Sequence, residues 1–118
     1  KACPPKDDDS EKEHDTIIQK IKSIIKQQLD KEISLRMISE KVGLNHQYLS
    51  ALFKNRTGKN FSKYVTEKRI EKAKQLLQET NLKIYEIAEL SGYHSIKHFT
   101  NAFRSMEGCS PSEFKNRE

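Results

Sequence analysis

Residues 35–58 read LRMISEKVGLNHQYLSALFKNRTG, and residues 84–108 read IYEIAELSGYHSIKHFTNAFRSMEG. The two stretches repeat one pattern of apolar residues, small residues and glycines, with one residue inserted after the first glycine of the second copy. The matched pairs are Leu35 and Ile84, Ile38 and Ile87, Ser39 and Ala88, Gly43 and Gly92, Leu49 and Phe99, Leu52 and Ala102, Phe53 and Phe103, and Gly58 and Gly108. Such a repeat indicates that the chain folds as two copies of one structural unit.

Each copy predicts two short amphipathic helices joined by a glycine turn, because apolar residues recur three and four positions apart on both sides of the glycine. Ser34 and Asn45 are suited to cap the two helices of the first copy, whereas Lys83 is a poor cap at the start of the second. This arrangement is typical of the helix-turn-helix, whose second helix enters the major groove of DNA. Two units in one basic chain predict contact with two neighbouring grooves.

Three further helices are expected outside the two copies. One lies before the first copy, where apolar residues recur at helical spacing at Ile17, Ile18, Ile21, Ile24, Ile25 and Leu29. A long amphipathic helix is predicted at residues 61–79, between the copies. Ser110, Pro111 and Glu113 form a start signal for a short last helix that carries Phe114. We therefore predict an all-α fold of about seven helices.

The domain boundaries follow from composition. Residues 1–15 hold two adjacent prolines and six acidic residues without apolar periodicity, which predicts an acidic disordered linker. Residues 16–118 are predicted to form the DNA-binding domain. Within it, residues 16–58 form the first helix-turn-helix unit, residues 61–79 the linker helix and residues 83–117 the second unit.

The charge distribution favours a polyanionic partner. The net charge is +5 although residues 1–15 are acidic, so the remainder is strongly basic. No apolar run approaches the ~20 residues that span a bilayer, and no signal peptide is visible at the start. The two cysteines stand at opposite ends and form no framework, so a cytoplasmic location is expected.

Helical phase divides each predicted recognition helix into two faces. Apolar residues must point inward, namely Tyr48, Leu49, Leu52 and Phe53 in the first unit and Phe99, Ala102 and Phe103 in the second. The outward positions are Gln47, Ser50, Ala51 and Lys54, then Lys97, Thr100, Asn101 and Arg104, with His98 at the margin. Gln and Asn can pair with adenine, Lys and Arg can donate to guanine, and Ala can touch a thymine methyl.

Other polar residues are candidates for contacts to phosphate. Helix starts offer backbone N–H groups to anions, and far helix ends often meet the DNA backbone. The candidates are Asn45, Lys54, Lys59, Asn60, Ser62, Lys63, Ser95 and Arg104. Arg69, on the linker helix, is instead expected to pair with an internal acidic residue. About eighteen residues of the linker helix would span ~27 Å at 1.5 Å per residue, and the connections at both ends would bring the two units to about one DNA turn apart, ~34 Å.

A longer pattern adds a family resemblance. Its residues are Arg69, Ile70, Ala73, Leu76, Leu77, Ile84, Ile87, Ala88, Gly92, Tyr93, Phe99, Phe103, Gly108, Ser110 and Pro111. In these residues the chain resembles the AraC/XylS transcription regulators of bacteria, over about residues 16–117. The resemblance implies seven helices, promoter binding, and transcription control that is mostly activation, often through contact with RNA polymerase.

Carried over by position, the base-contacting places of the family fall on Gln47, Ser50 and Ala51 in the first unit and on Ile96, Lys97, His98 and Asn101 in the second. Ala51 is smaller than the residue that several members have there, so the first unit is expected to make fewer hydrogen bonds. Ile96 is apolar where many members are polar, which favours a methyl or sugar contact.

The details look most like response regulators of the YesN type, in which a receiver domain precedes the DNA-binding domain. A receiver or ligand-binding domain is therefore expected before this segment, and sugar-sensing members with a cupin-like domain are the alternative.

Other classes of function fit less well. His94 and His98 are four residues apart, a spacing that can hold a metal, but no Cys, Asp or Glu stands at a useful offset beside them. No phosphate loop and no nucleophile with a base can be identified, so we expect neither an enzyme nor a metal or cofactor site. A non-specific nucleic-acid binder and a helical protein–protein adaptor are the remaining alternatives.

Overall fold

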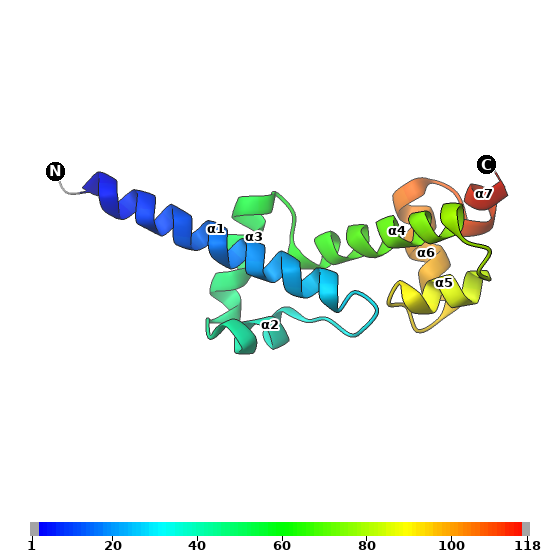
Figure 1. The fold of residues 1–118 in the computed structure, drawn as a ribbon, viewed down its shortest axis with the longest axis horizontal. Helices are drawn as coiled ribbons and strands as arrows, with labels where there is room; N and C mark the ends of the chain where they lie inside the picture. The colour runs from blue at the N-terminus through cyan, green and yellow to red at the C-terminus, as the bar shows by residue number, and fades with distance from the viewer. Residues whose placement is uncertain (1–2, 117–118) are drawn as a thin grey trace. The chain divides into compact units, whose positions relative to one another are not determined.

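The structure is a computed structural model that describes the backbone of residues 3–116 and the side chains of residues 12–116. This part of the chain forms seven α-helices and no strand (Figure 1). The helices are α1 (Cys3–Gln27), α2 (Leu35–Val42), α3 (His46–Thr57), α4 (Phe61–Glu79), α5 (Ile84–Leu90), α6 (Ile96–Glu107) and α7 (Pro111–Asn116). The all-α prediction is confirmed. Among the described residues, no helix combines the length and the apolar character needed to cross a membrane.

The first helix begins earlier than the sequence predicts. A disordered linker was expected at residues 1–15, but α1 already begins at Cys3, so that prediction is wrong for residues 3–15, while residues 1 and 2 lie outside the described part. Proline is compatible with the first turn of a helix, where its missing N–H has no partner to lose, so Pro4 and Pro5 do not prevent helix formation. Once the apolar stripe further along is packed, adding helical turns costs little.

The helices group into two compact units. The first contains α1, α2 and α3 and ends at Phe61. The second contains α4 from Ser62 onward with α5, α6 and α7, and it also includes Leu29–Glu32, the segment that follows α1. The sequence assigned Leu29–Glu32 to the first unit, and the structure corrects this, because this segment packs on residues of α4 and of the α5–α6 turn.

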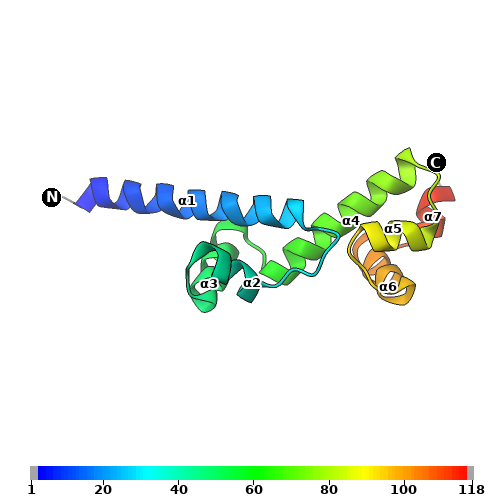
Figure 2. The same cartoon turned by 60° about the horizontal axis from the view of Figure 1, so that its bottom comes forward.

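The core of the first unit forms where α1 contacts α2 and α3 (Figures 1 and 2). The spacing of three and four residues places the buried side chains of α1 on one stripe. The buried residues are Ile18, Ile21 and Ile25 of α1, Ile38 of α2, and Leu49, Leu52 and Phe53 of α3. The ring of Phe61 meets that of Phe53 edge to face, with 5.8 Å between centroids, and closes this core.

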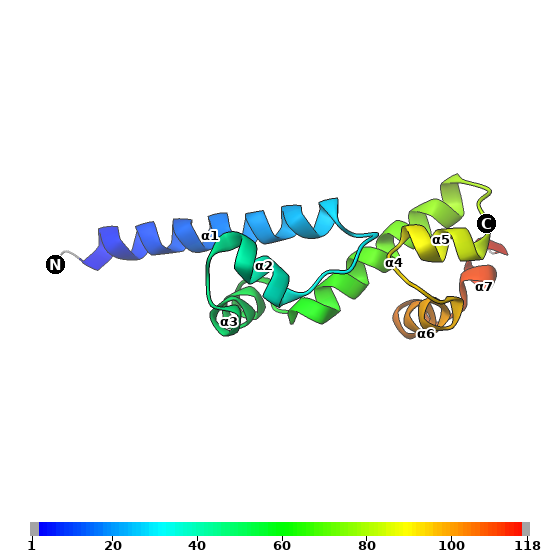
Figure 3. The ribbon, with the colours of Figure 1, turned by 90° about the horizontal axis from the view of Figure 1, so that it is seen from below.

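The core of the second unit is aromatic. It forms among α4, α5 and α6, which Figure 3 shows from below. Its buried residues are Ile70, Ala73 and Leu77 of α4, Ile87 and Ala88 of α5, and Phe99 and Phe103 of α6. Phe114 of α7 packs edge to face on Phe103 at 5.5 Å between centroids. The capping box predicted for α7 is present, because the Ser110 hydroxyl accepts from the Glu113 N–H at 3.2 Å and the Glu113 carboxylate accepts from the Ser110 N–H at 2.9 Å.

We expect Phe53→Ala and Phe103→Ala each to destabilise the fold by about 3–5 kcal/mol, because each removes a fully buried ring and leaves a cavity. Urea or thermal unfolding followed by circular dichroism measures the loss. A variant that melts like the parent chain and only binds DNA poorly would contradict these core positions.

Arg69 of α4 holds the Leu29–Glu32 segment through its backbone. Its Nε donates to the Leu29 carbonyl at 3.3 Å, and its Nη2 donates to the Lys31 carbonyl at 2.9 Å. The sequence predicted an acidic partner for Arg69, and this is wrong, because two backbone carbonyls take that place. A turn that leaves two carbonyl groups without partners in the backbone can use a guanidinium as their donor.

Gly92 sits against the same contact. Its φ of 96° is in the left-handed region, and a Cβ there would overlap the Leu29 carbonyl oxygen and the Arg69 guanidinium. Gly108 also has a positive φ, 82°, but a Cβ there would meet no atom within 4 Å. Gly92 is therefore required by both backbone conformation and space, and Gly108 by conformation alone.

The two glycines provide a matched comparison. We expect Gly108→Ala to cost about 1–2 kcal/mol in unfolding free energy, the strain of a left-handed alanine. Gly92→Ala is expected to cost about 3 kcal/mol or more, because backbone must also move away from the new methyl group. Equal losses of unfolding free energy in the two variants, measured by chemical unfolding, would show that the Leu29–Glu32 segment can shift to make room for the methyl group. The close contact of this segment with Gly92 would then not contribute to stability.

Candidate nucleic-acid interface

The first helix-turn-helix is shaped by side chains that satisfy the helix ends. The Ser34 hydroxyl accepts from the Met37 N–H at 3.1 Å and starts α2, which ends at Gly43 with a φ of 73°. The Asn45 Oδ1 accepts from the N–H groups of Gln47 and Tyr48, at 2.8 and 3.1 Å. The predicted caps Ser34 and Asn45 are thus confirmed, and α3 begins where the sequence placed it.

The phase of α3 agrees with the prediction in all but one residue. Leu49, Leu52 and Phe53 are buried, and the opposite face exposes Gln47, Ser50, Ala51 and Lys54. Tyr48 was predicted to point inward, but it is 44% exposed. Its ring lies at the flank of the apolar stripe, where it meets a polar residue of α1.

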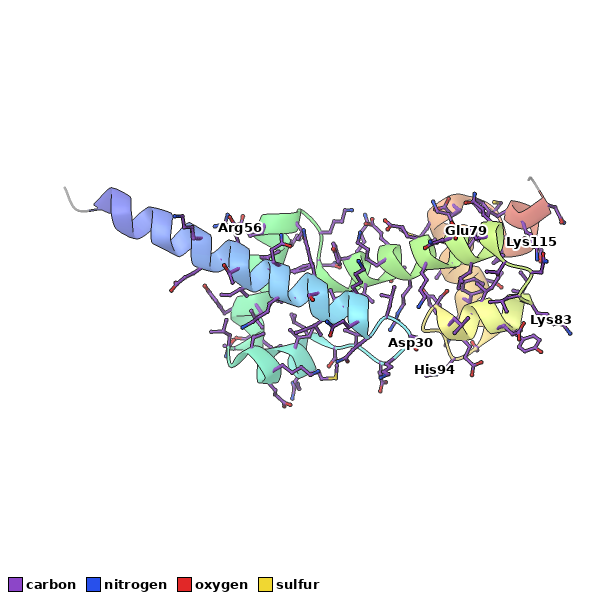
Figure 4. All side chains as sticks on the ribbon, viewed as in Figure 1. Asp30, Arg56, Glu79, Lys83, His94 and Lys115 are labelled. Carbon is purple, nitrogen blue, oxygen red and sulfur yellow. The ribbon has the colours of Figure 1, made fainter. Side chains whose placement is uncertain are left out.

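The second helix-turn-helix has its own capping arrangement. At the start of α5, the Glu86 carboxylate accepts from the backbone N–H of Lys83 at 2.9 Å (Figure 4). The side chain of Glu86 thus satisfies the helix start although Lys83 is a poor N-cap residue. At the start of α6, the Ser95 hydroxyl accepts from the His98 N–H at 3.1 Å. Residue Ser95 is therefore the N-cap of α6, and the helix ends at Gly108.

The outward face of α6 carries the residues that the sequence selected. Phe99 and Phe103 are fully buried, while Thr100 and Ala102 are half-buried at the margins. The exposed residues are Ile96, Lys97, His98, Asn101 and Arg104. Ile96 is 49% exposed, a large apolar side chain at the start of a helix, where it is open to a partner.

The phosphate candidates are at the surface. Lys59 and Asn60 precede α4, and Ser62 and Lys63 lie in its first turn, all exposed. Asn45 is exposed and Ser95 half-buried, and their side-chain oxygens already accept backbone N–H groups. The amide NH₂ of Asn45 and the hydroxyl proton of Ser95 are the donors that these two residues can still offer to an anion.

A shallow hollow beside the start of α6 adds two residues that the sequence reasoning missed. It has a volume of about 260 Å³ and is lined by Tyr85, Ala88, Glu89, Tyr93, His94, Ser95 and Ile96. Tyr85 is 54% exposed, and His94 lies in the turn before α6 (Figure 4). His94 directly precedes Ser95 in the sequence, whereas only the fold brings Tyr85 beside Ser95 and Ile96. Within the described part of the chain, His94 and His98 belong to no group of three or more His, Cys, Asp or Glu residues that could hold a metal ion.

Arg69 also supports the turn that leads into α6. Its guanidinium lies 5.7 Å from the centre of the Tyr93 ring. Burial lowers the pKa of Arg69 and raises the pKa of Tyr93. The turn at Gly92 and Tyr93 is thereby fixed just before the cap of α6.

We expect Arg69→Ala to destabilise the second unit by about 1–3 kcal/mol, because it leaves the carbonyls of Leu29 and Lys31 without their donor. The neighbouring Lys68 provides the control, since its pair with Glu71, at 3.5 Å, is exposed and Lys68→Ala should cost under about 1 kcal/mol. Amide hydrogen exchange in α5 and α6 measures the difference, and equal protection in both variants would contradict it.

Comparison with known proteins identifies the fold. A family profile described as a helix-turn-helix domain matches residues 38–117, which is more than half of the chain. The chain belongs to this family. The family consists of AraC-type DNA-binding domains of transcription regulators, which are not enzymes.

Similar structures cover nearly the whole chain. The C-terminal domain of the two-component response regulator yesN from Fusobacterium nucleatum is 37% identical, with a TM-score of 0.79 over 82% of this chain and 95% of that chain. The C-terminal domain of AraT, a response regulator from Geobacillus stearothermophilus, is 31% identical, with a TM-score of 0.84 over 86% and 85% of the two chains. The resemblance to AraC-type regulators is thus confirmed.

Curated relatives are longer proteins. The HTH-type transcriptional regulator YtdP of Bacillus subtilis is 33% identical over 95 residues, which is 80% of this chain and 12% of that protein. The chain spans 12% of YtdP and 38% of LumQ, a probable transcriptional regulator of Photobacterium leiognathi that is 36% identical over 95 residues. The AraC-type helix-turn-helix domain is therefore the part that they share with this chain.

Proposed function

We propose that this chain is the sequence-specific output domain of a larger transcription regulator and binds promoter DNA in the bacterial cytoplasm. The observation that carries the proposal is that α3 and α6 each expose, at matched positions, a stripe of side chains suited to base edges. The stripes consist of Gln47, Ala51 and Lys54, and of Lys97, Asn101 and Arg104. Buried rings on the opposite face of each helix fix the direction in which the stripes point.

The chemistry of the two stripes differs. In α6, Lys97 can donate to guanine acceptors, Asn101 can pair with adenine, and Ile96 can touch a thymine methyl or a sugar. His98 can donate or accept at a base edge. In α3, Gln47 and Ser50 supply hydrogen bonds but Ala51 supplies only a methyl group. We infer that α6 contributes more to base selection than α3.

The remaining candidates would hold the DNA backbone. Lys59, Lys63 and the far-end residues Lys54 and Arg104 bring positive charge to phosphates. Asn45, Asn60, Ser62 and Ser95 can donate hydrogen bonds from positions close to helix starts. We add Tyr85 and His94, because the hollow that they line adjoins Ser95 and Ile96.

Binding-site selection on random duplex DNA tests the proposal. A selected motif with two blocks would show that both recognition helices read bases, and one block would show that only one does. No enrichment, with affinity that falls steeply as salt rises, would reduce the chain to a non-specific binder. No DNA binding at all would favour a protein–protein adaptor.

Substitutions in α6 then test base reading. We expect Lys97→Ala and Asn101→Ala each to cost about 1–3 kcal/mol at the selected site. Asn101→Ala should hardly change binding to random DNA, because an amide adds no phosphate attraction. Gln75→Ala, on the exposed side of α4, serves as the control and should change neither. Equal losses on selected and random DNA would contradict the role of Asn101 in base reading.

The context of the domain is part of the proposal. Two similar structures come from response regulators, which supports a receiver domain before this segment in the full protein, with a sugar-binding domain as the alternative. Activation through RNA polymerase is proposed from the family resemblance. In vitro transcription from a promoter that carries the selected site measures both the sign of regulation and the need for the polymerase contact.

A further inference from the structure

A cluster of polar side chains joins the early turns of α1 to the recognition helix α3. The His14 Nε2 lies 3.0 Å from the Tyr48 hydroxyl, and the His14 Nδ1 lies 3.2 Å from the Arg56 Nη2. The Arg56 Nη1 also pairs with the Asp15 carboxylate at 3.4 Å. We call these four residues the α1–α3 clasp. All of them belong to the first unit.

The clasp continues the packing stripe of α1. His14 precedes Ile18, Ile21 and Ile25 at intervals of four, three and four residues, so the four side chains share one face of the helix. The three isoleucines are buried and His14 is half-buried. The imidazole of His14 thus occupies a position of the α1 stripe where a helix that only packs on its neighbour would have an apolar residue.

The α1–α3 clasp contacts α3 outside the stripe of base-reading residues. Arg56 follows Lys54 by two residues, about 200° around the helix, so it lies on the opposite side from that stripe. Its side chain is 27% exposed, and it reaches α1 (Figure 4). Tyr48 directly follows Gln47 and flanks the stripe. The two contacts of His14 are therefore spaced along α3 by two helical turns.

We propose that His14 and Asp15 are positioning residues for α3, which set how tightly the first unit binds its part of the DNA site. This inference rests on the proposed function of α3. It assigns a role in DNA affinity to the early turns of α1, which the sequence predicted to be a disordered linker. A partner that bends or rotates these turns would act on α3 through the clasp.

The chemistry of the clasp requires a singly protonated imidazole. Arginine has donors only, so the Nδ1 of His14 accepts from Arg56 and its proton resides on Nε2, where it can donate to the Tyr48 oxygen. A second proton would remove the acceptor and bring a positive ring against Arg56. The charged and titratable groups that face the ring are Arg56, Tyr48 and the neighbouring Asp15.

The test compares two substitutions at one position. His14→Ala removes both contacts, whereas the amide of His14→Gln can still donate and accept hydrogen bonds. Gln19→Ala, at an exposed and neutral position of α1, is the control. Affinity is measured on the selected DNA site and on a site in which the block that responds to Gln47→Ala has been scrambled. Thermal unfolding checks that each variant is folded.

We expect His14→Ala to weaken binding to the intact site about three- to tenfold, the effect of one or two net hydrogen bonds, and to leave the scrambled site unchanged. His14→Gln should restore the affinity, and Gln19→Ala should not change it.

Three results would overturn the inference. They are unchanged affinity in His14→Ala, equal losses on both sites, or a His14→Gln variant as weak as His14→Ala. If His14→Ala fails to fold, Tyr48→Phe replaces it, because it keeps the ring and removes only the hydroxyl that meets His14. A parent chain that does not distinguish the two sites would instead overturn the proposed function, and the inference with it.

Discussion

The burial of aromatic rings on one side of α3 and α6 is the constraint on which the rest of the structure depends. Phe53 in α3 and Phe99 and Phe103 in α6 are fully buried. Because a helix turns by about 100° per residue, burying these rings determines which side chains lie on the opposite face. The polar stripes that we assign to base reading are exposed for this reason, and not through contacts of their own.

Around these cores, polar side chains form hydrogen bonds with backbone N–H and carbonyl groups that have no partner within the helices. Ser34, Asn45, Ser95 and Ser110 accept N–H groups at helix starts. Arg69 gives donors to two carbonyls of the segment after α1. This last contact makes a segment from the early part of the chain an integral element of the second unit. It also explains why Gly92 tolerates no side chain.

The faces of the recognition helices and most of the candidate site could be predicted from the sequence. Periodicity separates Leu49 from Gln47 and Phe99 from Lys97 without reference to any other part of the chain. The prediction was wrong for Tyr48, because its position at the flank allows either environment and the neighbouring His14 decides between them. Tyr85 was missed for a similar reason, since it lies beside Ser95 and Ile96 only when α5 and the start of α6 are packed, whereas His94 directly precedes Ser95 in the sequence.

The sequence by itself determined the two repeated units, the helix ends and the outward stripes, because each is encoded by residues within a few positions of one another. Only the tertiary structure decided the partners of Arg69, the requirement at Gly92, and the contacts of His14 and Asp15 with α3. The hydrogen bonds of Arg69, His14 and Asp15 join residues 34 to 42 positions apart. A hydrogen bond over such a separation leaves no periodic trace in the sequence, since it depends on where packing brings two distant backbones together.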